Sequence, residues 1–282
     1  MILILLFSLA SACPINYSRD TKFIQTDNYP VVLMHGIISN RNNMNELKLF
    51  LESNFKLDVI VPEIGNGIPN SVNLPLNIQG EILCNDLNSN PLLKNGFNFI
   101  GVSQGGLLGR YYIERCGDYR VNNFITLVTP HGGVYKKIIG TIIDMYGEYA
   151  QEHYSFSSYW RDPFNYEKYL DVSLLADLNN EYFSGNSTIN KYRFSKLNNF
   201  VMVYSINDEV VTPPESGKFF TYEIDSLDIV PLNYTSTYKS LGLDIFDKEN
   251  RLFVYKTECL HEQHKNKDCF SQLYNMFQKF CL

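Results

Sequence analysis

Residues 97–109 read Phe-Asn-Phe-Ile-Gly-Val-Ser-Gln-Gly-Gly-Leu-Leu-Gly and place Ser103 in a Gly-x-Ser-x-Gly pattern. The run before it, residues 98–102, is typical of a buried strand, and residues 107–115 carry apolar side chains near helical spacing. A serine between a strand and a helix is typical of a nucleophile elbow. The alternative is a glycine-rich turn that merely joins the strand to the helix. We therefore predict that Ser103 is a catalytic nucleophile.

Strand and helix patterns alternate on both sides of this stretch. Buried strands are expected at residues 30–38, 57–61, 123–128, 200–205 and 251–255, and helices at residues 45–55, 77–87 and 272–280. The alternation predicts an α/β fold, with a mainly parallel central sheet and helices on both faces. Together with the elbow, it predicts the α/β-hydrolase fold.

The alternation lapses between about residues 133 and 198, where the chain is rich in aromatic residues and only partly helical. Insertions at this place in hydrolase folds usually form a cap over the active site, and an apolar lining would suit an acyl chain. Plain core packing is the alternative role of these aromatic side chains. We expect a single α/β-hydrolase domain at residues 13–282, with a cap insertion at about residues 133–198.

The first twelve residues are apolar and end in Ala10-Ser11-Ala12, which predicts a secretory signal peptide at residues 1–12, cleaved before Cys13. A buried N-terminal strand is the alternative, because no Lys or Arg precedes the run. A membrane span would need roughly 20 apolar residues, so we expect no stable span. Ala10 also disfavours a bacterial lipid-attachment site at Cys13.

The sequence also carries the marks of a protein made for an oxidising compartment. Three Asn-x-Ser/Thr sequons, at Asn16, Asn186 and Asn233, suit a eukaryotic secretory glycoprotein, either lysosomal or secreted. The six cysteines are an even number, which favours disulfides. The net charge of -6 gives no electrostatic case for nucleic-acid binding. A metal site of Cys259, His261, His264 and Cys269 is the disfavoured alternative, and we expect no metal.

Two backbone N–H groups are candidates for an oxyanion hole. The N–H of Gln104 follows Ser103 at the start of a helix, where a developing negative charge is stabilised. The strand at residues 30–38 contains His35-Gly36, and the loop after such a strand supplies the second donor in hydrolases, which makes Ile37 our candidate. His35 is expected to brace this loop by hydrogen bonds.

The acid and the base of a catalytic triad are sought after the last two strands, because hydrolase triads follow the chain order Ser, Asp or Glu, His. Asp208 is the nearer carboxylate after residues 200–205, with Glu209 as the fallback. His261 and His264 both follow residues 251–255, and spacing alone does not choose between them. The other histidine is expected to be an ordinary surface residue.

Several longer stretches give the chain a family resemblance over residues 30–281. The stretches are His35-Gly36, Glu63-Ile64-Gly65, Gly101 to Gly106, Arg115-Cys116, His131-Gly132-Gly133-Val134-Tyr135, Tyr159-Trp160-Arg161-Asp162-Pro163 and Leu175-Ala176-Asp177-Leu178-Asn179-Asn180-Glu181. With them the chain resembles the palmitoyl-protein thioesterases, which are depalmitoylating α/β-hydrolases of lysosomes and the secretory pathway. The last two stretches are absent from generic lipases.

The resemblance implies roles for particular residues. It implies Ser103 as nucleophile, Asp208 as acid and, by register from Leu241-Gly242-Leu243, His261 as base; it also implies a disulfide between Cys84 and Cys116. Among the other cysteines we expect a Cys259–Cys281 link. The sequence departs from the family at two places: Cys259-Leu260 replaces a Gly-Asp that often precedes the histidine, and Ile38 replaces a glycine of the oxyanion loop.

The expected reaction is hydrolysis of long-chain acyl thioesters, such as palmitoyl groups on S-acylated proteins or peptides. It would proceed through an acyl-enzyme on Ser103 and need no cofactor. We expect a monomer. The alternatives are a lipase or carboxylesterase acting on oxygen esters, and a hydrolase-fold protein that binds acyl chains without turnover.

Overall fold

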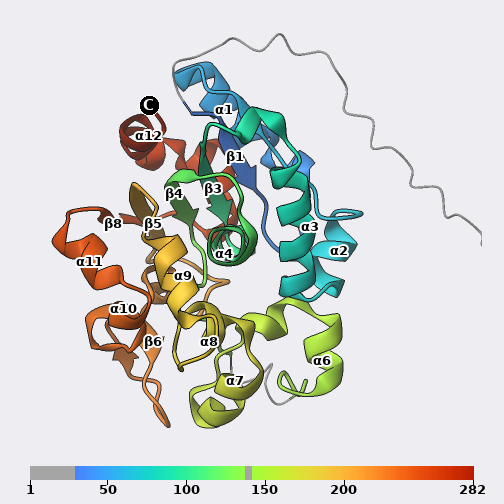
Figure 1. Cartoon of the computed structure of the whole chain (residues 1–282), viewed down its shortest axis with the longest axis vertical. Helices are drawn as coiled ribbons and strands as arrows, with labels where there is room; N and C mark the ends of the chain where they lie inside the picture. Colours follow the sequence, from blue (N-terminus) through green and yellow to red (C-terminus); the bar gives the residue numbers. More distant parts are fainter. Residues whose placement is uncertain (1–28, 137–141) are drawn as a thin grey trace, which may run out of the picture.

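The computed structural model describes residues 29–136 and 142–282, with a six-stranded sheet at its centre (Figure 1). The strand order is β2-β1-β3-β4-β5-β8, and all neighbouring strands are parallel. The strands are β1 (Val31–Met34), β2 (Val59–Ile60), β3 (Phe97–Val102), β4 (Val121–Leu127), β5 (Asn199–Ser205) and β8 (Leu252–Thr257). The predicted parallel α/β sheet is confirmed, with every expected strand present.

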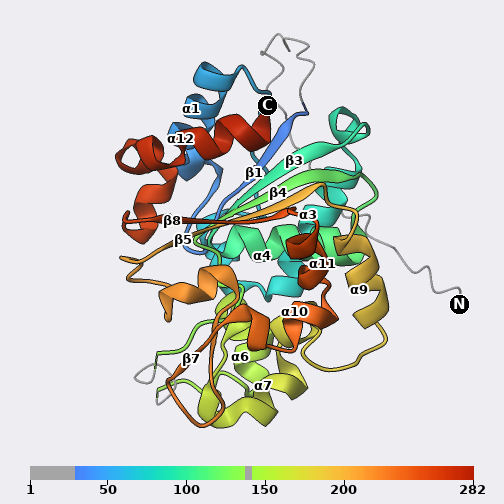
Figure 2. The same cartoon turned by 90° about the vertical axis from the view of Figure 1, so that its left-hand side faces the viewer.

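Both faces of the sheet are buried, because successive side chains of a strand point to opposite sides. On β1, Val31 and Leu33 pack toward α1 (Asn45–Phe55) and α12 (Lys267–Cys281). Val32 and Met34 pack toward the opposite layer, built chiefly from α3 (Leu76–Asn88), α4 (Gln104–Tyr111), α9 (Ser187–Phe194) and α11 (Leu243–Lys248). Figure 2 shows α1 and α12 on one side of the sheet and α4 on the other.

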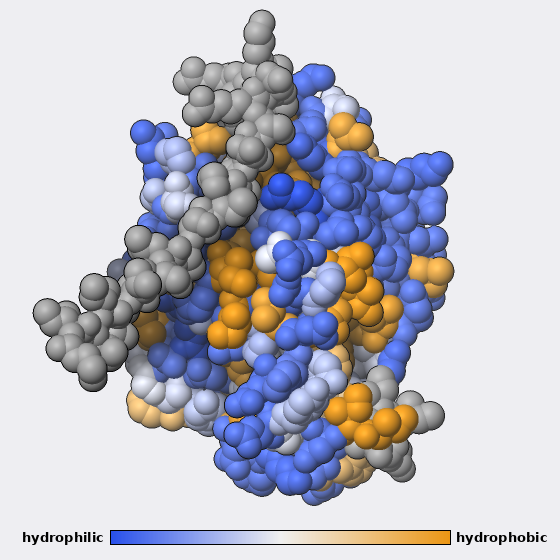
Figure 3. Space-filling view, turned by 90° about the vertical axis from the view of Figure 1, so that its right-hand side faces the viewer, coloured by the Kyte–Doolittle hydropathy of each residue, from blue (hydrophilic) through white to orange (hydrophobic). Residues whose placement is uncertain are grey.

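Helix α3 has a buried and an exposed face. Leu83 and Leu87 are fully buried against the sheet, whereas Ile78 is 44% exposed. The short helix α2 (Ile68–Asn73) precedes it and exposes Ile68. Figure 3 shows apolar side chains in the middle of the molecular face that lies on the α3 side. Scattered exposed apolar residues are normal on a protein surface, so α3 is an ordinary amphipathic layer helix.

Between β4 and β5 the chain forms short helices below the sheet in Figure 1. These are α6 (Glu148–His153), η4 (Ser155–Tyr159), η5 (Pro163–Asn165), α7 (Tyr166–Val172), α8 (Leu174–Leu178) and α9. A buried ion pair of 2.9 Å joins Arg161 to Glu181, which also accepts hydrogen bonds from Tyr166 and Tyr169. One buried polar cluster therefore holds together the two signature stretches at residues 159–163 and 175–181.

The segment between β5 and β8 consists of elements for which the sequence shows no clear hydrophobic period. It contains a hairpin of β6 (Thr221–Tyr222) and β7 (Ile229–Val230), followed by α10 (Thr237–Ser240) and α11. Elements of two to six residues are too short to show a hydrophobic period. In the part of the chain that the structure describes, no helix has the length and apolar content needed to cross a bilayer.

The cysteines pair differently from our expectation at the C-terminus. Cys84 and Cys116 form a disulfide that ties α3 to the π-helical turn after α4 (Tyr112–Cys116), a link of the kind that contributes about 2–4 kcal/mol. The expected Cys259–Cys281 link is wrong: Cys259 bonds Cys269, and Cys281 is a buried free thiol. Cys269 and Cys281 lie near opposite ends of α12, about 18 Å apart at 1.5 Å per residue, so only one can reach Cys259. Cys13 lies outside the described residues.

Candidate active site

Ser103 lies at a tight turn between β3 and α4. Its backbone has φ 54° and ψ −127°, a conformation that non-glycine residues rarely adopt. The turn is closely packed, since a Cβ added to Gly101 would lie 2.4 Å from Gly106 Cα, and one added to Gly105 would lie 2.4 Å from Met34 O. The glycines of the motif are thus required by contact with backbone. This is the geometry that a nucleophile elbow needs.

Asp208 and His261 form a hydrogen-bonded pair at the same edge of the sheet. His261 Nδ1 lies 3.0 Å from Asp208 Oδ1 and 2.9 Å from Oδ2. Asp208 Oδ1 also accepts the backbone N–H groups of Val210 and Val211, which hold the carboxylate in place. Because a carboxylate accepts, Nδ1 carries the proton, and Nε2 of a neutral His261 is left as a proton acceptor.

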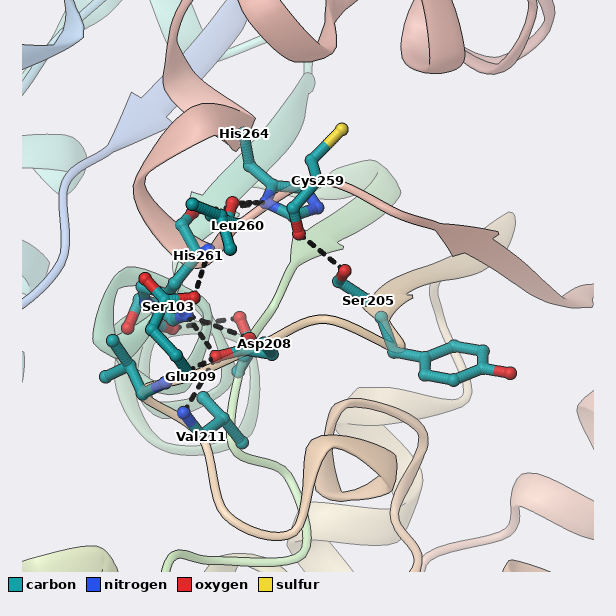
Figure 4. Close-up of polar contacts among 12 residues, drawn as sticks. Ser103, Ser205, Asp208, Glu209, Val211, Cys259, Leu260, His261 and His264 are labelled. Atoms are coloured by element: carbon teal, nitrogen blue, oxygen red, sulfur yellow. Dashed lines mark hydrogen bonds and ion pairs between the residues drawn. The ribbon is translucent and has the colours of Figure 1, made fainter.

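The parallel strands bring these residues together. Ser103 follows β3 directly, Asp208 lies three residues after β5, and His261 lies four residues after β8. Carboxyl ends of parallel strands meet at one edge, and Figure 4 draws the three side chains in one group there. Among the described residues, no hydrogen bond joins Ser103 Oγ to His261. Such contacts in unliganded sites are often long and tighten when substrate binds.

His264 occupies a different environment. Its Nε2 lies 2.8 Å from Thr257 Oγ1, and its Nδ1 lies 3.1 Å from the carbonyl oxygens of Leu260 and His261. The side chain is fully buried, and burial lowers its pKa. Our expectation that the second histidine is a surface residue is therefore wrong. His264 braces the loop that carries His261.

The sulfur atoms near His264 are also accounted for. Cys259 and Cys269 lie close to His264, but they are bonded to each other. Disulfide sulfurs are not thiolates, and zinc binds the thiolate form. The cluster considered as a metal site is therefore a disulfide beside a buried histidine.

Glu209 also contacts His261, through the backbone. Glu209 Oε2 accepts the His261 N–H at 3.0 Å, while its own carbonyl oxygen accepts a hydrogen bond from Lys136 Nζ. Two consecutive carboxylates thus hold one histidine, Asp208 at the ring and Glu209 at the main chain. Only Asp208 is in a position to orient the imidazole.

The loop after β1 lies against Ser103. A Cβ added to Gly36 would lie 3.0 Å from Ser103 Cβ and 3.5 Å from Ser103 Oγ, so the backbone passes next to the hydroxyl. Ile37 is the next residue in this loop, and Gln104 begins α4, where the first N–H groups have no intrahelical acceptor. Ile38 has φ 52°, the left-handed conformation that favours glycine. The departure at this position therefore leaves an isoleucine in a backbone conformation suited to glycine.

His35 braces this loop together with Glu63. His35 Nε2 lies 2.9 Å from Glu63 Oε1, and its Nδ1 lies 2.9 Å from Gly36 O. Burial alone would raise the pKa of Glu63, but hydrogen bonds from His35, Arg41 N and Ile64 N lower it overall. Glu63 is thus held ionised, which fixes His35 and the start of the loop.

A buried amide network supports the elbow from below. Gln104 Nε2 donates to Gln79 Oε1 at 3.1 Å and to Ser71 O at 3.0 Å, and Tyr159 Oη donates to Gln104 Oε1 at 3.0 Å. All four side chains are at least 96% buried. The sequence offered no signal for Gln79, because a glutamine in a helix usually faces solvent. Tyr159 belongs to a signature stretch, whose link to the elbow only the structure reveals.

The sequons and the cysteines are placed at different depths. Asn186 and Asn233 are exposed, whereas Asn16 lies outside the described residues. Asn186 Nδ2 also donates to Asp177 Oδ2 at 3.3 Å. The Cys84–Cys116 disulfide lies near α4 and not at Ser103. The two described sequons and this disulfide therefore bear on folding and surface chemistry, and they do not line the candidate active site.

The family model and the relatives that match this chain point to the same family. The model of the family described as Palmitoyl protein thioesterase matches residues 30–261. Palmitoyl-protein thioesterase 3 of Dictyostelium discoideum is 39% identical over 254 residues, covering 85% of this chain and 87% of the relative. Lysosomal thioesterase PPT2-B of Xenopus laevis is 30% identical, covering 80% and 83% of the two chains.

Solved structures show the same fold at low sequence identity. An extracellular alpha/beta-hydrolase from a Paenibacillus species has a TM-score of 0.52 at 12% identity, covering 89% of this chain and 98% of its own. Bacillus licheniformis lipase BlEst2 in its propeptide form has a TM-score of 0.54 at 13% identity, covering 90% of this chain and 50% of its own. The α/β-hydrolase fold expected from the elbow is confirmed.

Proposed function

The chain belongs to the palmitoyl protein thioesterase family, and from this premise we propose that it hydrolyses long-chain acyl thioesters with Ser103, Asp208 and His261 as catalytic triad. The observation that carries the proposal is the Asp208–His261 hydrogen bond at the edge of the sheet where the Ser103 elbow ends. A serine nucleophile needs a base and a group that orients the base. Ser103, His261 and Asp208 supply the nucleophile, the base and the orienting group.

Acylation begins when His261 Nε2 takes the proton of Ser103 Oγ. The Oγ atom then forms a bond to the thioester carbonyl carbon, and the carbonyl oxygen becomes an oxyanion. Asp208 stabilises the imidazolium that results, through Nδ1. The C–S bond breaks, the proton on Nε2 passes to the departing sulfur, and an acyl ester remains on Ser103.

Deacylation repeats these steps with water. His261 Nε2 takes a proton from water, whose oxygen attacks the ester carbonyl, and the proton returns to Ser103 Oγ as the fatty acid leaves. The N–H groups of Gln104 and Ile37 are the proposed donors to both oxyanions. Support for this assignment is the position of Gln104 at the start of α4 and the contact of Gly36 with Ser103. The residues of the site need no cofactor for these steps.

The substrate class follows from the family and the segment between β4 and β5. We take residues 133–198 as a cap and palmitoylated proteins or peptides as substrates, in line with the names of the relatives. Tyr135, Met145 and Trp160 form an apolar cluster in this segment. Such a cluster gives the cap a core of its own. We propose that this cap also binds the acyl chain of the substrate.

We further propose that the chain enters the secretory pathway and acts in lysosomes or outside the cell, as a monomeric glycoprotein. Two disulfides and the exposed sequon residues Asn186 and Asn233 support this. A relative is named as a lysosomal thioesterase. The signal peptide at residues 1–12 and glycosylation at Asn16 belong to the same proposal and lie outside the described residues.

Rates on matched substrates test the reaction class. We expect a palmitoyl thioester to be cleaved faster than the oxygen ester of the same acyl group, with both activities removed in Ser103→Ala. A preference for the oxygen ester would indicate a lipase or carboxylesterase. Acyl binding without any turnover by the wild-type protein would contradict the enzyme proposal.

A further inference from the structure

A cavity lies at the end of the sheet opposite to Ser103. It has a volume of about 600 Å³ and lies around the start of β4 and the segment that leads from α9 into β5. In Figure 2, α9 lies near the amino ends of the strands, whereas Ser103 and His261 follow the carboxyl ends of β3 and β8. Seven residues of β4 at about 3.3 Å each separate the two ends of the sheet by roughly 20 Å. The cavity is therefore separate from the catalytic site.

The cavity is lined by cations. Four basic residues face one carboxylate there, although the chain as a whole has a net charge of -6. Among the residues that the structure describes, Arg251 has an ion-pair partner in Glu249, whereas the other three cations have none. The lining residues that bear charge are Arg120, Arg193, Lys196, Arg251 and Asp118. This concentration of unpaired positive charge predicts an anionic ligand.

Arg193 gives the cavity a specific donor. Its Nη1 atom is buried and has no hydrogen-bond partner within the described residues. A buried polar group without a partner is unfavourable, and a turn of the guanidinium toward the cavity would bring Nη1 to a bound acceptor. The planar guanidinium matches phosphate oxygens in a bidentate geometry. Arg120 is exposed nearby and leaves the site open to solvent.

We propose that this cavity binds a phosphate monoester, either on a small soluble molecule or on a lipid headgroup. Its volume lies within the range of about 300–1,000 Å³ that small-molecule sites occupy. Arg193 and Lys196 contribute the charge on the α9 side, and Arg120 contributes it on the β4 side. The ligand is held without contact with the triad, so this is a binding site in addition to the thioesterase site.

Isothermal titration with inorganic phosphate tests the proposal on the full mature chain. Wild type is expected to bind phosphate, and Arg193→Gln to bind it at least about tenfold more weakly, as expected for a lost charge-assisted hydrogen bond. Lys256→Gln is the matched control, because it removes one exposed positive charge on β8 outside the cavity. Arg120→Gln is a second test at an exposed position, where folding is not at risk.

Flotation with phosphatidylcholine vesicles, with and without phosphatidic acid, separates the two ligand sources. Arg193-dependent binding to phosphatidic acid alone assigns a lipid headgroup, and Arg193-dependent binding to inorganic phosphate assigns a soluble ligand. The proposal is overturned if wild type binds neither probe, or if Arg193→Gln and Arg120→Gln bind as well as wild type. Thioesterase activity is expected to be unchanged in all these variants, so failure here leaves the proposed function untouched.

Discussion

Glu209 accepts the backbone N–H of His261, while its neighbour Asp208 accepts from the imidazole of the same residue. The two carboxylates are adjacent in sequence, but one acts on the position of the loop and the other on the orientation of the ring. Only the second contact stabilises an imidazolium directly. Substitutions at the two positions are therefore expected to differ in size.

We expect Asp208→Ala to lower kcat by about 10³ to 10⁴-fold, because the imidazole loses its orienting partner. Glu209→Ala removes one hydrogen bond to a charged group and is expected to cost about tenfold. Glu209→Gln retains an acceptor and is expected to recover most of that loss. Steady-state kcat on a palmitoyl thioester measures all three. Equal losses for the two alanine variants would contradict the assignment of Asp208 as the triad acid.

The two C-terminal histidines are expected to separate in single-turnover acylation. His261→Ala removes the base and should slow acylation and deacylation alike. His264→Ala leaves the Asp208–His261 pair in place and should act mainly by loosening the loop, which lowers the unfolding midpoint more than the acylation rate. Normal acylation by His261→Ala with a collapse for His264→Ala would reverse the assignment.

Much of this site could be predicted from sequence because its signals are local. The elbow glycines, the strand after which Asp208 lies and the strand before His261 each depend on a few neighbouring residues. The partners of Gln104 could not be predicted, because Gln79 and Tyr159 lie 25 and 55 residues away along the chain. The Cys259–Cys269 link depends on where α12 begins. The helix begins at Lys267, where the Asn266 side chain accepts a hydrogen bond from Asp268 N. The predicted helix, at residues 272–280, begins later in the chain.

Ile38→Gly is expected to raise the stability of the protein. Ile38 has φ 52° and a side chain that is 67% exposed, so glycine relieves backbone strain while little apolar burial is lost. We expect a gain of about 1 kcal/mol in the free energy of unfolding. Ile206→Gly is the control, since Ile206 is also exposed but has no positive φ, and there glycine should destabilise. Denaturant unfolding of both variants gives the comparison, and a loss of stability in Ile38→Gly would contradict the strain.

Titration of the Glu114 carboxyl is expected to make the protein more stable in mild acid than at neutral pH. Burial raises its pKa to about 7 from the usual 4.5, although Arg110 at 2.8 Å opposes the rise. Between these pH values the folded state keeps a proton that the unfolded state has lost, so raising the pH through this range favours unfolding. This loss begins above pH 4.5 and is complete above about pH 7.

Glu114→Gln removes this titration and should flatten the dependence of stability on pH between those values. Chemical denaturation of wild type and variant across this range measures the difference in slope. Parallel curves for the two proteins would show that Glu114 stays ionised in the folded state. The absolute stability of the variant does not affect the comparison, because only the slopes are compared.

The most direct test of the account is to locate the acyl group during turnover. The protein is mixed with a palmitoyl thioester, quenched in acid and digested, and its peptides are analysed by mass spectrometry. We expect a palmitoyl ester on the peptide that contains Ser103, and in folded Ser103→Ala no such adduct and a turnover reduced by roughly 10³-fold or more. An adduct on another residue, or wild-type turnover by Ser103→Ala, would contradict the central claim.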